Sequence, residues 1–543
     1  MRTWCITCAK IGARMTARGI RYRVTQENAL TALVAVGLLL RVWQYAANPS
    51  LWYDELSIAR NLTQLSLRQL VTGPLLYTQI APVGFIAALK IATMIFGTTD
   101  VALRLVPFLC GIAGLLLFRR LAVRALDGTA ATISVGLFAL APPLIRYSTE
   151  LKQYGMDVLI TVALMLVALD LIDRPTTRRC IIAGVAGFVV IVFSQAAILV
   201  MAGLGAALLI TRRGPVLITV ALWALASIAG LALARHYAAP ATLAFMQGFW
   251  GVRHGFLPLP PRPTTGIAWM WTRLTQLFTE RWMLEYPLPL LYSVLTVLGV
   301  VVLWRQRRPL ALILVGPFVM TLAAAMAQQY PFHTRVVLFL LPSVLMALAA
   351  VIAWVKLPVV MVVLLLPPLY TIVTKRPPYV VESYKPMFAF FQAHRQPGDS
   401  VYVFSTTSEA ADFYGPRYGL AAGTYYVGIC DRKDTRPFIA DFDRFRGTPR
   451  LWVLTSGPPP YTWARRTIGR YLGTIGVRTD SIVLPSFEFT PVSADLYNLS
   501  DTTRLAAAQA ATFPVDAPPD TVHPGCRDLR PVRRPVRPGG NAP

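Results

Sequence analysis

The sequence predicts a polytopic α-helical membrane protein that ends in a soluble α/β domain. Hydrophobic residues make up 55% of the 543-residue chain, charged residues make up 14%, and the mean hydropathy is +0.53. A soluble globular protein carries about 25% charged residues. Apolar runs alternate with short basic clusters as far as Val373, and the composition is mixed after it. These observations predict about eleven transmembrane helices followed by a separate outer domain.

The formal charge of +26 raises the question of nucleic-acid binding. Proteins that bind nucleic acid gather Lys and Arg on one face, often with aromatic residues between them. Here the basic residues stand in small clusters between apolar runs. The charge therefore reflects membrane topology, because cytoplasmic loops collect Lys and Arg. We expect no nucleic-acid partner.

Basic residues precede the first apolar segment, Ala29 to Gln44, and place the N-terminus inside. No cleavable signal is evident, because the basic region is long and Arg41 to Ser50 has no small-x-small site. We therefore interpret residues 1–28 as the basic cytoplasmic N-terminal segment of a multi-pass protein of the cytoplasmic (inner) membrane. The pair Asp54-Glu55 then lies on the outer side.

The later spans are assigned so that every later basic cluster lies on the cytoplasmic side. The segment from Ala81 to Phe96 is apolar enough to cross, but counting it would move all later clusters outside. Its length of about 16 residues is short for a span, and Lys90 in its middle favours a helix along the outer interface. We expect Ser194-Gln195 to form an outside turn. The predicted later spans are Val101 to Phe118, Ala130 to Ile145, Gly155 to Ile172, Cys180 to Phe193, Ala196 to Ile210, Pro215 to Ala234, Leu288 to Leu303, Leu310 to Ala327, Val336 to Val355 and Leu357 to Val373.

The predicted domains are a transmembrane domain at 29–373, an extracytoplasmic α/β domain at 374–501 and a Pro/Arg-rich tail at 502–543. The composition of the tail is typical of an extended or disordered segment. In the outer domain the pattern predicts a helix and two strands, at Ser383 to His394, Ser400 to Phe404 and Arg450 to Leu454.

Of the six cysteines, only Cys430 and Cys526 lie outside in this topology. An oxidising compartment permits a disulfide between them, and free thiols are the alternative. Cys5 and Cys8 form a lone CxxC without partner ligands, and the five His residues are scattered. We therefore expect neither a metal nor a cofactor, and a divalent ion at the acidic pair Asp54-Glu55 is the alternative.

The pair Asp54-Glu55 is the strongest candidate for a functional site, because a carboxylate beside lipid loses solvation. Other outer loops add polar groups that are candidates for catalysis or substrate binding. Each of these has a simpler interpretation: basic residues anchor helix ends in lipid headgroups, tyrosines form aromatic belts, and glutamine or histidine is commonly structural. The added candidates are Tyr53, Gln79, Glu150, Lys152, Tyr154, His333 and Arg335.

Carboxylates and fixed cations on one membrane face suit transfer from a lipid phosphate to a hydroxyl. A carboxylate takes the proton of the incoming hydroxyl, while Arg and Lys stabilise the charge left on the departing phosphate.

Four motifs follow one another in the chain: Leu51 to Ala59 (LWYDELSIA), Gln79 to Phe85 (QIAPVGF), Arg104 to Pro107 (RLVP) and Tyr147 to Tyr154 (YSTELKQY). In order and spacing this series resembles the GT-C glycosyltransferases, and within them the bacterial relatives of protein O-mannosyltransferases and of lipid A aminoarabinose transferases. The resemblance covers roughly Ala29 to Val373. Its specificity lies in the Asp-Glu pair followed by Ala-Pro and then Glu-x-Lys-x-Tyr.

Such enzymes move a sugar from a polyprenyl-phosphate carrier to an acceptor on the outer face, usually with inversion. The resemblance therefore implies a glycosyltransferase of cell-envelope glycans, whose partners are a lipid-linked sugar donor, membrane lipids and a glycan, lipid or protein acceptor. It implies Asp54 as general base, Glu55 as a supporting carboxylate and Glu150 as an acidic residue that shapes the site. Arg335 matches the basic residue expected near the carrier phosphate, and Lys152 stands where many relatives have Arg.

The motif Ala81-Pro82 departs from the Pro-Pro of the mannosyltransferases, so their acceptor class is not carried over. An ion-coupled transporter or lipid flippase is the alternative function, in which the carboxylates would couple protons or ions. Transporters prefer charges near the membrane midplane and often have repeated halves, and neither feature is evident in this sequence. If the protein were a receptor or scaffold, the Asp54-Glu55 pair would have no function.

Overall fold

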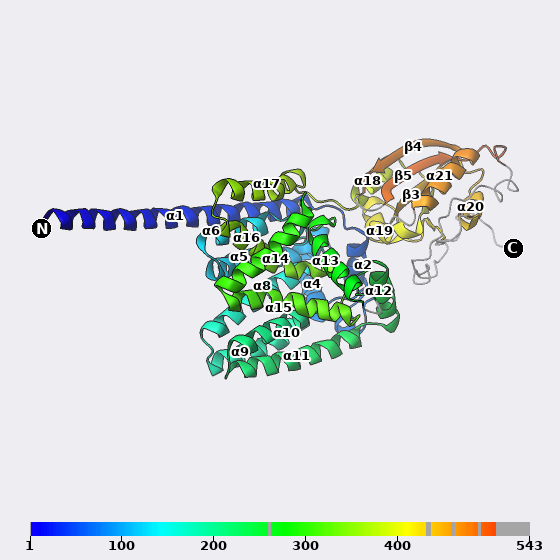
Figure 1. The fold of residues 1–543 in the computed structure, drawn as a ribbon. Helices are drawn as coiled ribbons and strands as arrows, with labels where there is room; N and C mark the ends of the chain where they lie inside the picture. The colour runs from blue at the N-terminus through cyan, green and yellow to red at the C-terminus, as the bar shows by residue number, and fades with distance from the viewer. Residues whose placement is uncertain (1, 259–261, 430–435, 458–461, 487–489, 506–543) are drawn as a thin grey trace.

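The computed structural model describes residues 2–258, 262–429, 436–457, 462–486 and 490–505, with side chains from residue 25 onward except at 263, 462–464 and 490. A helical body carries a smaller part with a five-stranded sheet at one end, and the N-terminal helix projects from the other end (Figure 1). The predicted fold class, a polytopic helical membrane protein with a C-terminal α/β domain, is confirmed. The predicted total of about eleven crossings stays a prediction.

Within the described residues, seven helices are long and apolar enough to cross a membrane. They are α1 (Arg2–Ala47, apolar from Thr25), α5 (Asp100–Ala125), α8 (Tyr154–Asp173), α11 (Val216–Tyr237), α14 (Pro289–Gln306), α15 (Arg308–Met326) and the pair η1 (Thr334–Leu340) with α16 (Leu341–Trp354). Shorter helices of the same body are α4 (Val83–Phe96), α6 (Gly128–Leu140), α9 (Thr177–Phe193), α10 (Ala197–Thr211) and α17 (Pro358–Thr374).

Proline residues change two of the predicted spans. The segment predicted as one helix from Ala130 to Ile145 breaks after Leu140, and α7 (Pro142–Arg146) starts anew with Pro at its first position. Proline has no N–H to donate and disfavours helix in the residue before it. Similarly, α16 starts around Pro342, and the chain before it is the tighter 3-10 helix η1, which begins next to His333.

Helix α4 covers only 14 residues, about 21 Å of helix. Its interfacial placement stays a prediction, but the role of Lys90 differs from the expected one. The Lys90 ammonium donates to the carbonyl of Leu62 at 2.7 Å. Leu62 lies in the last turn of α2 (Tyr53–Gln64), where a cation meets the negative end of the helix dipole. Lys90 therefore binds a neighbouring helix of the protein.

Two helices that the apolar pattern does not predict, α12 (Pro240–Val252) and α13 (Pro263–Thr279), form between α11 and α14. Both begin with proline, which is pre-organised for the first helical position. Helices α2 and α12 lie at the end of the helical body that faces the sheet, where α19 (Ser408–Tyr414) of the C-terminal part lies beside α2 (Figure 1). A short helix, α3 (Leu67–Thr72), follows α2.

The C-terminal part is an α/β layer whose strand order is β2-β1-β3-β5-β4. Strands β1 and β2 and strands β1 and β3 pair in parallel, whereas β5 is antiparallel to both β3 and β4. The predicted helix and both predicted strands are present. The elements are α18 (Tyr384–His394), β1 (Ser400–Val403), η2 (Ser405–Thr407), α19 (Ser408–Tyr414), η3 (Gly415–Tyr418), β2 (Tyr426–Val427), α20 (Arg436–Asp443), β3 (Leu451–Gly457), α21 (Thr462–Ile475), β4 (Val477–Leu484) and β5 (Thr490–Asn498).

The predicted disulfide pair lies outside the described residues, because Cys430 falls in 430–435 and Cys526 in 506–543. The bond stays a prediction. The Pro/Arg-rich tail is described only as far as residue 505.

Candidate active site

A cavity of about 800 Å³ opens where α2, α12 and η1 meet the loop before α8. Its lining joins residues that are far apart in the sequence and mixes aromatic, charged and aliphatic side chains. Of the predicted site residues, seven line it: Tyr53, Asp54, Gln79, Lys152, Tyr154, His333 and Arg335. Glu55 and Glu150 are the two that do not.

Helix α2 separates the two acidic residues of the pair. It begins at Tyr53, so that Asp54 and Glu55 both stand in its first turn, where the helix dipole favours negative charge. Successive helical residues point about 100° apart. Asp54 consequently faces the cavity, while the side chain of Glu55 turns into the protein and is 1% exposed.

The Asp54 carboxylate lies between two cations. Its Oδ2 accepts a hydrogen bond from Arg335 Nη2 at 2.6 Å, and its Oδ1 lies 3.3 Å from Lys152 Nζ. Burial alone would raise the pKa of Asp54, but the charges of Lys152 and Arg335 hold it below its ordinary value. Asp54 is therefore ionised at neutral pH, and this one carboxylate pairs with both cations.

Glu55 instead forms a buried ion pair with Arg104 of α5. Arg104 donates from Nε at 2.9 Å and from Nη2 at 2.6 Å, and the N–H of Leu151 donates to the same carboxylate at 2.8 Å. Such a bidentate arrangement fixes both groups in orientation. Glu55 thus joins the start of α2 to α5 and to the loop that carries Lys152.

Glu150 is buried beside the site and pairs with a different arginine. Its Oε2 lies 3.0 Å from Nη2 of Arg146, whose guanidinium stacks on the ring of Trp282 with 3.7 Å to the centroid. Burial raises the pKa of Glu150, and the Arg146 cation opposes that shift. Because Glu150 does not line the cavity, we assign it no contact with substrate.

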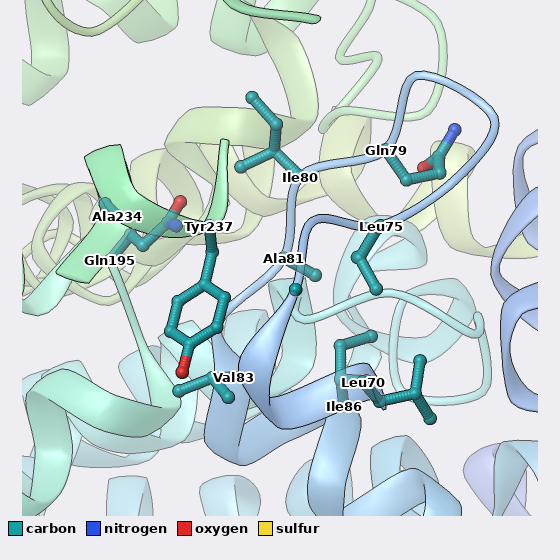
Figure 2. A pocket seen from close by; sticks show the side chains of 11 residues that line it. Leu70, Leu75, Gln79, Ile80, Ala81, Val83, Ile86, Gln195, Ala234 and Tyr237 are labelled. Carbon is teal, nitrogen blue, oxygen red and sulfur yellow. The ribbon is translucent and has the colours of Figure 1, made fainter. Parts of the chain in front are cut away.

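Lys152 and Gln79 meet across the cavity floor. Lys152 Nζ donates to Gln79 Oε1 at 2.6 Å, which orients the ammonium beside Asp54. Burial lowers the pKa of Lys152, and the Asp54 charge opposes the shift. Gln79 also lines a small recess together with Gln195 and Tyr237, and Figure 2 shows it on the opposite side of the view from those two residues. The Tyr237 hydroxyl donates to the Val71 carbonyl and so ties α11 to α3.

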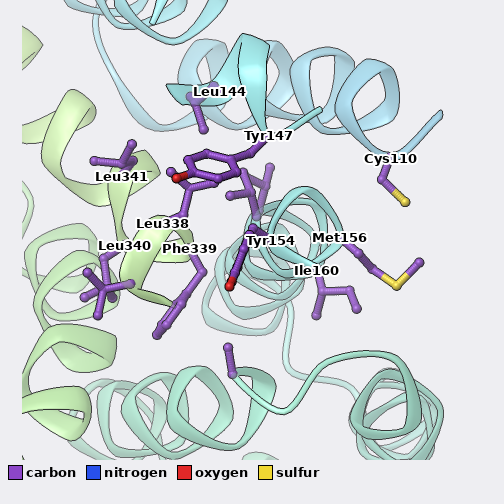
Figure 3. Close-up of a cluster of buried hydrophobic side chains, with 14 of the residues drawn as sticks. Cys110, Leu144, Tyr147, Tyr154, Met156, Ile160, Leu338, Phe339, Leu340 and Leu341 are labelled. Atoms are coloured by element: carbon purple, nitrogen blue, oxygen red, sulfur yellow. The ribbon is translucent and has the colours of Figure 1, made fainter. Parts of the chain in front are cut away.

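Arg335 is positioned by the packing of η1 against α8. Figure 3 shows Leu338 and Phe339 of η1 in one buried cluster with Tyr147 and Tyr154. The Arg335 guanidinium lies over the ring of Trp52 at 5.1 Å and over that of Tyr154 at 6.0 Å. Aromatic faces attract cations and limit their movement. Arg335 is thereby held against Asp54, although 281 residues separate them.

His333 stands next to Arg335 in a basic environment. Its ring lies 5.5 Å from that of Trp250, and its Nδ1 is 3.0 Å from the Thr334 hydroxyl. Burial, together with the charges of Arg273, Arg253 and Arg335, lowers the pKa of His333 to about 3. His333 is therefore neutral at physiological pH and contributes hydrogen bonding without charge.

Several lining residues were not among the sequence candidates. Arg253 and the aromatic residues Trp250 and Trp282 come from the segments around α12 and α13, which showed no recognisable motif. Thr406 and Glu409 come from the C-terminal domain. Among the described residues, no group of three His, Cys, Asp or Glu side chains is arranged to hold a metal ion.

Residues 81–237 match the model of the dolichyl-phosphate-mannose-protein mannosyltransferase family. No curated protein matches the sequence. The structure is similar to an oligosaccharyltransferase from Archaeoglobus fulgidus tethered with an acceptor peptide, with TM-score 0.46, 12% identity and coverage of 85% of this chain and 74% of that one. It is also similar to ArnT from Cupriavidus metallidurans bound to undecaprenyl phosphate, with TM-score 0.35, 12% identity and coverage of 86% and 97%.

The family match spans α4 to α11 and includes the Ala-Pro and Glu-x-Lys-x-Tyr motifs. The Asp54-Glu55 motif and Arg335 lie outside the matched segment, and the geometry of the cavity connects them to it. The match at 81–237 confirms the resemblance to the GT-C glycosyltransferases, and with it the prediction that the chain is a glycosyltransferase.

Proposed function

We propose that the protein transfers a sugar from a polyprenyl-phosphate carrier to an acceptor hydroxyl on the extracytoplasmic face, with Asp54 as general base. The observation that carries the proposal is the Asp54 carboxylate set between Lys152 and Arg335 in a large cavity at one end of the helical body. This reaction requires a base and phosphate-binding cations, and here two cations each lie within 3.3 Å of the Asp54 carboxylate.

The transfer is a single displacement at the anomeric carbon of the donor. The acceptor oxygen forms a bond to that carbon as the bond to the phosphate oxygen breaks, and the acceptor proton passes to Asp54. The carrier phosphate leaves with an added negative charge, which Lys152 and Arg335 stabilise. Attack opposite to the leaving group inverts the anomeric configuration.

The composition of the cavity wall supports a lipid-linked donor. Beyond the charged groups, the wall is aliphatic and aromatic where α11 and α12 border the cavity, which suits an isoprenoid chain. These residues are Leu231, Ala234, Ala238, Leu243, Phe245 and Met246.

A lipid analysis tests the function as a whole. A strain that lacks the protein should accumulate one glycosylated polyprenyl phosphate and lose one sugar from a surface glycan. An unchanged lipid pool and an unchanged glycan would exclude the proposed reaction.

Arg335→Ala is expected to weaken binding of bare undecaprenyl phosphate. A charge-assisted hydrogen bond contributes about 1.5–3 kcal/mol, which corresponds to roughly 10- to 100-fold in Kd. Arg305→Ala is a suitable control, because this exposed arginine lies in the last turn of α14 and does not line the cavity. Titration of the full-length protein, followed by its tryptophan fluorescence, measures both variants. Equal affinities of Arg335→Ala and wild type for undecaprenyl phosphate would show that Arg335 does not bind the carrier phosphate.

The proposed topology has the N-terminus inside, α4 along the outer interface and the sheet domain outside. A reporter phosphatase fused after Lys375 is then expected to be active, and one fused after Arg120 is expected to be inactive. The reason is that this phosphatase folds only outside the cytoplasm. Activity of the Arg120 fusion would show that α4 crosses the membrane and that the later loops lie on the opposite sides from those proposed.

A further inference from the structure

The C-terminal domain is fixed over α2 by buried polar contacts with the membrane domain. Asp100 at the start of α5 pairs with Lys385 and with Arg417, both at 2.9 Å. The Tyr414 hydroxyl donates to Asp100 at 2.7 Å and accepts from the N–H of Leu51 at 2.7 Å. These contacts hold the turn between β1 and α19 at the cavity.

This docking of the C-terminal domain places the carboxylate of Glu409 at the cavity. Thr406 and Glu409 are the two residues of the C-terminal domain in the lining of the cavity. The Glu409 carboxylate accepts from the Ser57 hydroxyl at 2.9 Å, lies 3.7 Å from Nη1 of Arg60, and is 4% exposed. Ser57 follows Asp54 by three residues, so that both project from one face of α2 about one turn apart.

The cations that contact Asp54 and the carboxylate of Glu409 come from different parts of the chain. Lys152 lies in the loop before α8 and Arg335 in η1, whereas Glu409 stands on α19 of the C-terminal domain. In the proposed reaction the donor phosphate occupies the side of the two cations. The acceptor hydroxyl then approaches Asp54 from the side of α19.

We propose that Glu409 is an acceptor-binding residue, whose carboxylate accepts a hydrogen bond from a second hydroxyl of a polyhydroxylated acceptor such as a glycan. This proposal rests on the proposed function. A carboxylate at this place favours hydroxyl or amine groups and disfavours phosphate or carboxylate groups on the acceptor, because like charges repel. The C-terminal domain therefore takes part in acceptor selection.

The electrostatics of Glu409 add a pH dependence. Burial raises the pKa of Glu409 to about 7, and the charges of Asp412 and Asp54 act in the same direction, while Arg60 and the Ser57 hydrogen bond oppose it. The carboxylate accepts hydrogen bonds best when ionised. The apparent KM for acceptor should therefore rise as the pH falls below about 7 in the wild type.

Glu409→Gln tests the proposal, because glutamine keeps the size of the side chain but not its charge. Membranes of a strain lacking the protein supply both the accumulated donor and the unmodified acceptor, and purified full-length enzyme is added to them. Asp412→Asn is the matched control, since Asp412 lies on the same helix, pairs with the same Arg60 at 2.8 Å and does not line the cavity. Binding of undecaprenyl phosphate reports separately on the donor side.

We expect Glu409→Gln to raise the apparent KM for acceptor roughly 10-fold or more. In this variant the apparent KM should no longer change near pH 7. Its Kd for undecaprenyl phosphate should stay within about twofold of the wild type. Asp412→Asn should keep the wild-type KM above pH 7, and its rise in KM should begin at lower pH because the Asp412 charge no longer raises the pKa of Glu409. An unchanged KM, an equal loss in Asp412→Asn, or an equal loss of carrier binding would overturn the role of Glu409. Absence of any transfer by the wild-type enzyme would instead overturn the proposed function.

Discussion

Replacing Asp54 with asparagine is expected to lower the rate of sugar transfer by about 10²- to 10⁴-fold, the usual cost of losing a general base. Asparagine keeps the size of the side chain but cannot take the acceptor proton. The rate is measured in membranes of a strain lacking the protein, with equal amounts of added enzyme. Asp127→Asn is the control, because Asp127 forms an exposed ion pair with Arg307 far from the cavity.

The same substitution should strengthen the binding of bare undecaprenyl phosphate. In the structure one carboxylate pairs with both Lys152 and Arg335, so the carrier phosphate must compete with Asp54 for them. Removing the negative charge frees both cations, and we expect a decrease in Kd of about 10-fold. Loss of transfer together with tighter carrier binding distinguishes a missing base from a misfolded protein. Asp54→Asn enzyme that transfers sugar at the wild-type rate would exclude Asp54 as the base.

Glu55→Ala is expected to destabilise the protein strongly, in contrast to Asp54→Asn. The change leaves the Arg104 guanidinium buried without its carboxylate, and breaking a buried ion pair in this way costs about 3–5 kcal/mol. Thermal unfolding of the purified protein in detergent measures the loss. Glu27→Ala should change stability by about 0–1 kcal/mol, since the Glu27 pair with Arg119 is exposed.

A stable Glu55→Ala variant without transfer activity would contradict this account, because Glu55 would then act in the chemistry. The two acidic neighbours therefore make a direct comparison. One substitution should affect the reaction, and the other the fold.

Much of the fold is predictable because apolar runs and basic clusters are local features of the sequence. Most helices of the membrane body lie near their predicted places, and the turn at Ser194 is present between α9 and α10. The break at Pro142 and the 3-10 start of η1 show where proline overrides an apolar run. Helices α12 and α13 were missed, because their apolar residues are interrupted by glycine, threonine and glutamine, and in α13 also by arginine.

The site is less predictable, since its geometry depends on contacts between distant segments. The sequence motifs point to Asp54, Lys152 and Arg335, but they do not reveal that all three form one ion cluster. The resemblance implies different roles for Asp54 and Glu55, but the burial of Glu55 arises from helix geometry and from Arg104 and is not evident in the motif. Glu409 belongs to a domain without a recognisable motif, and only the docking of that domain brings it to the cavity.

The most direct test of the central claim is a lipid analysis of cells whose only copy carries Asp54→Asn. We expect the full-length variant to be present at the wild-type level while one glycosylated polyprenyl phosphate accumulates, as it should in cells that lack the protein. A lipid profile equal to that of the wild type would contradict the claim that Asp54 is the base of a lipid-phosphate glycosyltransferase.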